Sequence, residues 1–159
     1  MIRITEQYFW QVIFTVFFLI LIFLGVVILD TEARIPLADL TLFDLTLITL
    51  ASWRLTRLFV YDTITKFIRE QFADAVKEID GYVLVKPKKG PRRTLYELFY
   101  CPWCFGVWSA ATVSFFYLLT PLAVYPVIFL AIAAVASFLQ LLANLVGHHA
   151  EKAKRDVEG

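Results

Sequence analysis

The chain has few of the features by which a catalytic, secreted or nucleic-acid-binding protein is usually identified. It has only two cysteines, which are too few for a disulfide framework. Its net charge is only +1, which argues against nucleic-acid binding through bulk positive charge. It has no nucleophile elbow, P-loop, HExxH motif or carboxylate pair in a membrane-facing motif, and this weakens the case for an enzyme.

Apolar residues, by contrast, are abundant. They make up 60% of the 159 residues, and the mean hydropathy is +0.71. Soluble domains are about 45–50% apolar, so the excess indicates a protein that lies in a lipid bilayer. The aromatic content of 16% suits lipid-facing surfaces and interfacial belts.

Four segments have the length and composition of transmembrane helices. We expect spans at about residues 8–29, 39–60, 101–119 and 124–146. The first apolar run is too long for a signal peptide and has no small-residue cleavage site, so we expect it to remain uncleaved. The second run contains Asp44, Arg54 and Arg57, and both arginines lie close enough to its end to snorkel.

The last two spans are predicted to form a tight helical hairpin. The turn between them, LLTPLAVYP, contains two prolines and no charged residue. Small residues recur at four-residue spacing on both helices: Gly106, Ala110 and Ser114, then Ala133 and Ser137. This spacing predicts close helix approach, although small residues are also common in membrane helices for other reasons.

The positions of lysine and arginine predict the orientation. Basic residues are concentrated between residues 61 and 100 and in the tail after His149, whereas the other two connections carry a single arginine. The positive-inside rule therefore places both termini and the 61–100 loop in the cytoplasm. Four spans satisfy this arrangement, with residues 147–159 as a cytoplasmic tail.

The 61–100 loop contains a further predicted helix. Between Ile64 and Ile79, apolar residues follow helical spacing on one face and charged residues occupy the other. This pattern predicts an amphipathic helix that lies on the inner membrane surface or on a partner protein. Beyond it, YVLV is predicted to be a short extended segment and KPKKGPRR a basic turn. The turn includes the basic residues Lys88, Lys89, Arg92 and Arg93. They are interpreted either as a site that attracts anionic headgroups or only as a signal for membrane topology.

The arginine pair in the second span is a candidate binding site. Arg54 and Arg57 are three residues apart and share a helix face. Charged residues within a span are usually functional, so the pair is a candidate for binding a lipid headgroup or another anion. The favoured interpretation of the pair by itself is structural: pairing with Asp62 or Glu97, or simple snorkelling. Asp44 is interpreted as a residue at the outer end, in water.

The motif Cys101-Pro102-Trp103-Cys104 allows three interpretations. Two cysteines together with His148 and His149 match a tetrahedral zinc site by count, provided that Gly147 ends the last helix. Alternatively, CPWC is a redox-active dithiol at a helix N-terminus, similar to the CPYC of glutaredoxins but without their surrounding βαβ pattern. The third and favoured interpretation is structural: Pro102 begins the third span, and the cysteines are small packing residues.

Two motifs together resemble a known family. They are RLTRL with the nearby acid (Arg54, Leu55, Thr56, Arg57, Leu58 and Asp62) and CPxC with a downstream tryptophan (Cys101, Pro102, Cys104 and Trp108). In these positions the chain resembles the small bacterial and phage membrane proteins of the domain of unknown function 1360 family, which includes a sporulation-associated protein of bacilli. The resemblance covers roughly residues 45–145. It implies a membrane protein of bacterial or phage origin and no particular activity.

The sequence thus predicts an all-α, four-span protein with a single membrane domain of residues 1–159, located in the bacterial cytoplasmic membrane. The favoured function is a non-catalytic accessory protein that binds anionic lipid, a membrane-protein partner or a second copy of itself at its cytoplasmic face. The first alternative is a membrane thiol protein that uses CPWC for redox exchange or zinc binding. A phage lysis or pore-forming protein is the third hypothesis. No cofactor other than zinc and no nucleic-acid partner is expected.

Overall fold

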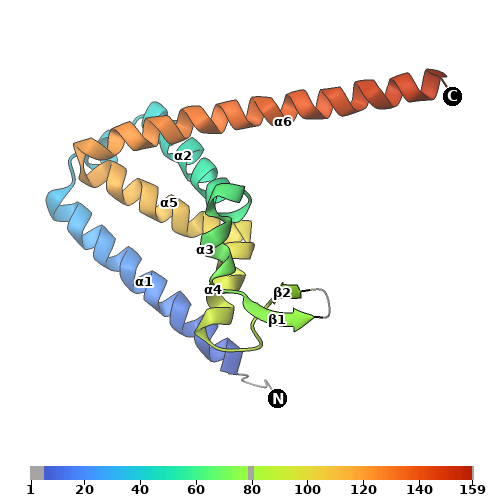
Figure 1. Ribbon diagram of the computed structural model, residues 1–159. Helices are drawn as coiled ribbons and strands as arrows, with labels where there is room; N and C mark the ends of the chain where they lie inside the picture. The colour runs from blue at the N-terminus through green and yellow to red at the C-terminus, as the bar shows by residue number, and fades with distance from the viewer. Residues whose placement is uncertain (1–5, 79–80, 159) are drawn as a thin grey trace, which may run out of the picture.

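Four long helices and a small polar layer make up the fold (Figure 1). The computed structural model describes residues 6–78 and 81–158. The long helices are α1 (Glu6–Glu32), α2 (Leu42–Val60), α5 (Pro102–Leu119) and α6 (Val124–Glu158). The polar layer lies between α2 and α5 in the sequence and contains α3 (Lys66–Glu70), the antiparallel strands β1 (Asp74–Glu78) and β2 (Gly81–Val85), and α4 (Pro91–Tyr100). We call this end of the molecule the basic end.

Helix α2 lies at the centre and packs against both α5 and α6. The core cluster contains Ile48, Ala51, Val113, Tyr117, Leu118 and Val127. Small side chains allow the close approach, since Ala51 and Ala134 are fully buried and Ser109 is 2% exposed. The small-residue stripe of the third predicted span does not pack on α6 as predicted, because Gly106 faces Thr56 of α2, with room for a Cβ 3.8 Å from its hydroxyl, and Ala110 is exposed.

Helix α1 is hydrogen-bonded to the rest of the molecule at its two ends, and between them Phe18 packs against Trp108 of α5 with ring centroids 4.5 Å apart. Near its start, Gln7 Nε2 donates to Thr94 Oγ1 at 3.0 Å. Just beyond its end, the Arg34 N–H donates to the Leu118 carbonyl at 2.9 Å. Between these points most of its apolar side chains are exposed. Such a surface is suited to contact with lipid rather than with water.

Within the described residues, three helices are long and apolar enough to cross a membrane: Gln7–Glu32, Pro102–Leu119 and Pro121–Asp156. The chain is therefore a mostly helical protein with several helices that can span a membrane. Helix α2 has 19 residues, but Asp44, Arg54 and Arg57 leave it without an apolar stretch like those of the other three. A membrane-spanning role for α2, and hence a count of four spans, stays a prediction.

The prediction of an amphipathic helix from Ile64 to Ile79 is wrong. Only α3 is helical after a 3₁₀ turn at Thr63–Thr65, and the chain then enters β1; Ile79 lies outside the described residues. Strand β1 pairs with β2 in a register that runs from Asp74↔Val85 to Glu78↔Gly81, so the class is not purely α. The backbone groups of β1 form hydrogen bonds with β2. The residue pattern of one strand alone does not predict these bonds. The extended YVLV segment is confirmed as part of β2.

Two other helices differ from the sequence prediction. Helix α4 was not expected, because PRRTLYELFY was interpreted as loop, yet Pro91 occupies a first-turn position that suits proline. Helix α6 continues through Gly147 to Glu158, so residues predicted as a tail are helical. A glycine inside a helix costs only about 1 kcal/mol, which the continuous hydrogen bonding of α6 outweighs.

A larger side chain at the centre of the helix packing should destabilise the fold. Ala51→Leu places three extra carbon atoms at a fully buried position on α2, so we expect a loss of about 1–3 kcal/mol in the free energy of unfolding. Titration with SDS in mixed micelles measures this loss. Ala110→Leu, at an exposed position on α5, is the matched control and should change stability little. Equal effects of the two substitutions would contradict the packing described here.

Candidate functional site

The C-terminal end of α2 is held by polar side chains from the segment that follows it. Arg54 forms an ion pair with Asp62, with Nη1 and Oδ2 2.8 Å apart. The Thr65 hydroxyl donates to the carbonyl of Leu58, and Arg69 Nη1 donates to the carbonyl of Phe59 at 2.8 Å. The last carbonyls of a helix lack partners within the helix. These side chains supply the partners and turn the chain back at the basic end.

Arg57 is held differently from Arg54. Its guanidinium lies over the ring of Trp53 at 5.5 Å and over the ring of Tyr61 at 5.4 Å. Among the described residues, no side chain or carbonyl accepts a hydrogen bond from it and no carboxylate pairs with it. Aromatic stacking fixes the plane of a guanidinium while its N–H donors stay available. Arg57 is therefore the arginine of the predicted pair that can bind an external anion.

The two arginines of the basic turn are engaged within the protein. Arg92 Nη2 donates to the carbonyls of Gln71 and Ala73, at 2.8 and 2.6 Å, and Arg92 Nη1 lies 3.1 Å from the Asp74 carboxylate. Arg93 donates to the Lys88 carbonyl at 2.7 Å. These contacts fix the polar layer, so Arg92 and Arg93 have structural roles. Lys88 and Lys89 are exposed.

Glu97 connects three parts of the chain at this end. Its carboxylate lies 2.8 Å from Lys86 Nζ and 3.1 Å from Arg93 Nε, and it accepts a hydrogen bond from Gln11 Nε2 at 3.0 Å. Burial by itself raises the pKa of Glu97, but the hydrogen bonds from Lys86, Arg93 and Gln11 outweigh it and lower the pKa below its ordinary value. The alternative in which Glu97 pairs with Arg54 or Arg57 is wrong, because its partners are Lys86, Arg93 and Gln11.

Four phenylalanines pack together beneath these charges. Phe59 of α2, Phe72 of the turn before β1, Phe99 of α4 and Phe105 of α5 form ring pairs with centroids 5.1–6.3 Å apart. The cluster joins the polar layer to the long helices. Sequence reasoning missed it because no periodic pattern connects four rings that come from four separate segments.

The two cysteines are joined by a disulfide, and they do not form a metal site with the histidines. Cys101 lies between α4 and α5, and Pro102 is the first residue of α5, as the structural interpretation predicted. His148 and His149 are exposed on the part of α6 that extends beyond the bundle (Figure 1). Within residues 6–78 and 81–158, no three His, Cys, Asp or Glu side chains are grouped closely enough to hold a metal. The zinc site required α6 to end at Gly147, and it continues.

Asp44 has a structural role at the opposite end of α2. It forms a capping box with Thr41, and its carboxylate accepts a hydrogen bond from the Tyr117 hydroxyl at 2.5 Å. The Arg34 guanidinium lies 6.0 Å from the centre of the Tyr117 ring. Asp44 is half-buried, and the sequence did not predict that its carboxylate ties α2 to α5.

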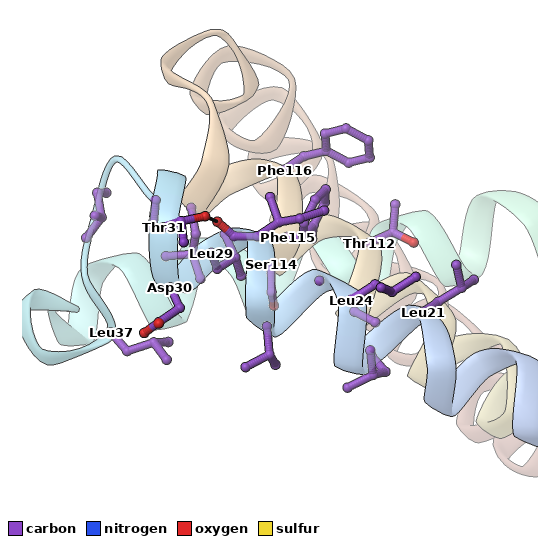
Figure 2. Close-up of a pocket in the computed structure, with 18 of the residues that line it drawn as sticks. Leu21, Leu24, Leu29, Asp30, Thr31, Leu37, Thr112, Ser114, Phe115 and Phe116 are labelled. Carbon is purple, nitrogen blue, oxygen red and sulfur yellow. Dashed lines mark hydrogen bonds between the residues drawn. The ribbon is translucent and has the colours of Figure 1, made fainter.

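An apolar groove of about 950 Å³ lies between α1 and α5 (Figure 2). Its walls include Leu21 and Leu24 of α1 and Phe115 and Phe116 of α5, and Asp30 is its one ionisable lining residue. Both walls belong to helices that can span a membrane, so the groove suits hydrocarbon chains of the bilayer. It contains none of the residues that the sequence singled out as a site.

Comparison with known proteins extends these observations. A family model described as protein of unknown function (DUF1360) matches residues 47–143. The match begins within α2 and ends within α6, so it includes the α2 terminus, the polar layer and the cysteine pair but not α1.

Two relatives from Bacillus subtilis (strain 168) are similar to the chain. The UPF0713 protein YngL is 39% identical over 98 residues, which are 62% of this chain and 74% of the relative. The sporulation protein YjcA is 35% identical over 105 residues, which are 62% of this chain and 88% of the relative. No solved structure matches the chain.

Acid should release the contacts of Glu97. A carboxylate whose pKa is lowered by folding stabilises the folded state above its unfolded pKa, and this stabilisation is lost as the pH falls through the folded value. Glu97→Gln should therefore cost about 1–2 kcal/mol at pH 7. The difference from the unmodified protein should shrink between about pH 5 and pH 3, as measured by SDS titration.

Glu151→Gln is the control for this prediction. Glu151 is exposed on α6 and pairs with Arg155 at 3.7 Å, so its replacement should change stability little at any of these pH values. A difference between Glu97→Gln and the unmodified protein that does not vary with pH would contradict the assignment.

Proposed function

The chain belongs to the family of proteins of unknown function DUF1360, and on that premise we propose that it is a non-catalytic accessory protein of the bacterial cytoplasmic membrane that binds anionic phospholipid through its basic end. The availability of Arg57 between two aromatic rings is the observation that carries this proposal.

The proposed orientation follows from the uneven distribution of charge along the long helices. The segment from Arg54 to Arg93, which carries most of the lysines and arginines, lies at the basic end, whereas Arg34 lies at the other end with Tyr117. Under the positive-inside rule the basic end faces the cytoplasm, with α2 as a fourth span and both termini on the same side. The helix directions in Figure 1 are compatible with this arrangement.

Arg57 would bind the phosphate of the lipid. A guanidinium offers two parallel N–H donors to a phosphate, and such charge-assisted bonds are stronger than neutral ones. The neighbouring Arg54 is neutralised by Asp62, so it supports the local structure without competing for the ligand. Tyr61 is 56% exposed, and tyrosine and tryptophan favour the headgroup region of a bilayer. The two rings would therefore hold Arg57 at the depth of the lipid phosphates.

Lys88 and Lys89 would add a less specific attraction. Both are exposed on the turn before α4. A basic residue near an anionic membrane surface contributes about 1 kcal/mol, and salt screens this contribution. The turn would thus draw anionic lipid to the basic end, while Arg57 would recognise the phosphate.

An accessory role also suits the relatives. The name of YjcA, sporulation protein, assigns that relative to a developmental process and not to a reaction. A protein that binds lipid at the cytoplasmic face of a membrane in such a process needs no catalytic group.

Removal of Arg57 should weaken the binding of phosphatidylglycerol. Native mass spectrometry of the full chain in mild detergent, with added phosphatidylglycerol or phosphatidylcholine, measures the lipid bound. We expect Arg57→Ala to raise the apparent Kd for phosphatidylglycerol about tenfold, because a hydrogen bond to a charged group contributes about 1.5–3 kcal/mol. Arg57→Lys should restore only part of the affinity, because a lysine lacks the planar pair of donors.

Arg155→Ala is the control, because Arg155 is an exposed arginine near the end of α6 and its removal changes the net charge equally. Equal retention of the two lipids by the unmodified protein, or full affinity in Arg57→Ala, would sink the proposal. If a membrane protein co-purifies at fixed stoichiometry and its binding depends on Arg57, the ligand of Arg57 is that protein and not a lipid.

A further inference from the structure

The disulfide lies at an accessible corner of the molecule. Cys104 is exposed in the first turn of α5, whereas Cys101 is half-buried between α4 and α5. The two Cα atoms are 5.3 Å apart. Next to the pair, Trp103 is 86% exposed and Tyr100 is 46% exposed. The outer sulfur and these two aromatic side chains are therefore open to a molecule that approaches this corner.

The surroundings of the two sulfurs differ in a way that suits exchange. An incoming thiolate can reach Cys104 Sγ more readily, since Cys104 is the more exposed of the two. The other sulfur, Cys101 Sγ, already accepts a hydrogen bond from the Cys104 N–H at 3.2 Å and occupies the N-cap position of α5. The N-terminus of an 18-residue helix stabilises negative charge. Cys101 is thus the better leaving sulfur, because its thiolate has a donor in place.

We propose that Cys101 and Cys104 form a reversible thiol–disulfide exchange site for a protein dithiol that docks on Trp103 and Tyr100. The first thiolate of the dithiol attacks Cys104 Sγ, the Cys101–Cys104 bond breaks, and Cys101 leaves as a thiolate that takes up a proton. The second thiolate of the dithiol then attacks its partner sulfur in the mixed disulfide and releases Cys104, which is also protonated. The chain gains two electrons and two protons, and the dithiol becomes a disulfide.

The cytoplasm favours a disulfide that is exchanged over one that is permanent. This step rests on the orientation given under the proposed function, in which the start of α5 faces the cytoplasm. Disulfides in that compartment are rarely structural and are usually transient, catalytic or redox-sensing. Beneath the corner, the rings of Phe99 and Phe105 pack with their centroids 5.2 Å apart, a contact that uses neither sulfur.

The exchange can be measured on the oxidised full chain in mild detergent. Reduced thioredoxin is the protein dithiol, dithiothreitol is the small dithiol, and a mass-tagged maleimide counts the thiols formed. We expect both dithiols to produce two thiols per chain without denaturant. A thioredoxin variant that lacks its second cysteine should remain attached, and peptide mapping should locate it on Cys104.

Replacement of the exposed tryptophan separates docking from chemical reactivity. Trp103→Ala should slow reduction by thioredoxin about fivefold or more and leave reduction by dithiothreitol unchanged, because only the protein uses the aromatic surface. Tyr125→Ala removes another exposed aromatic side chain, at the other end of the molecule, and should have no effect on either rate.

Three outcomes would overturn the exchange site: thiols that form only after denaturation, attachment of the probe at Cys101, or equal sensitivity of the two dithiols to Trp103→Ala. The outcome is independent of lipid binding. Cys101→Ser/Cys104→Ser should retain phosphatidylglycerol, and Arg57→Ala should exchange normally. Loss of one property with the other intact therefore identifies which proposal fails.

Discussion

The carbonyl groups at the C-terminal end of α2 must find donors, and much of the basic end is arranged around that need. A buried carbonyl group that is left without a donor costs about 1–3 kcal/mol. Thr65 and Arg69 satisfy the carbonyls of Leu58 and Phe59, and to reach them the chain has to turn back immediately after α2. Arg69 is buried as a result, with its charge placed where the carbonyl oxygens carry partial negative charge.

This reversal determines which charges remain available. Once the chain has turned back, β1 lies within reach of the turn before α4, and Arg92 and Arg93 are used to hold these segments together. Arg54 is used for the corner itself. Arg57 has no comparable task and is positioned by rings alone. The fold therefore decides which arginines hold the structure together and which one can bind a ligand. Composition alone does not distinguish them.

Local patterns predict part of this arrangement. The unbroken apolar run predicts α1, and Pro102 predicts the start of α5, because each depends on residues adjacent in the sequence. The segment 74–78 fits both helical and alternating patterns until its partner strand is known. The role of Glu97 depends on donors from α1 and from the end of β2, which no local pattern connects. The Arg54–Asp62 pair could be anticipated, since one helix end brings both residues together.

The length of α6 has a mechanical consequence. Its 35 residues extend over about 52 Å, well beyond a hydrocarbon core of about 30 Å. The helix continues after Gly147 without a break, and the side chains of residues 148–156 are exposed where it extends beyond the bundle (Figure 1). A rigid rod of this kind acts as a lever: a sideways load on its charged tip exerts a torque at Ala131 and Ala134, where α6 is buried. Force applied outside the bilayer would thus be felt at the centre of the bundle.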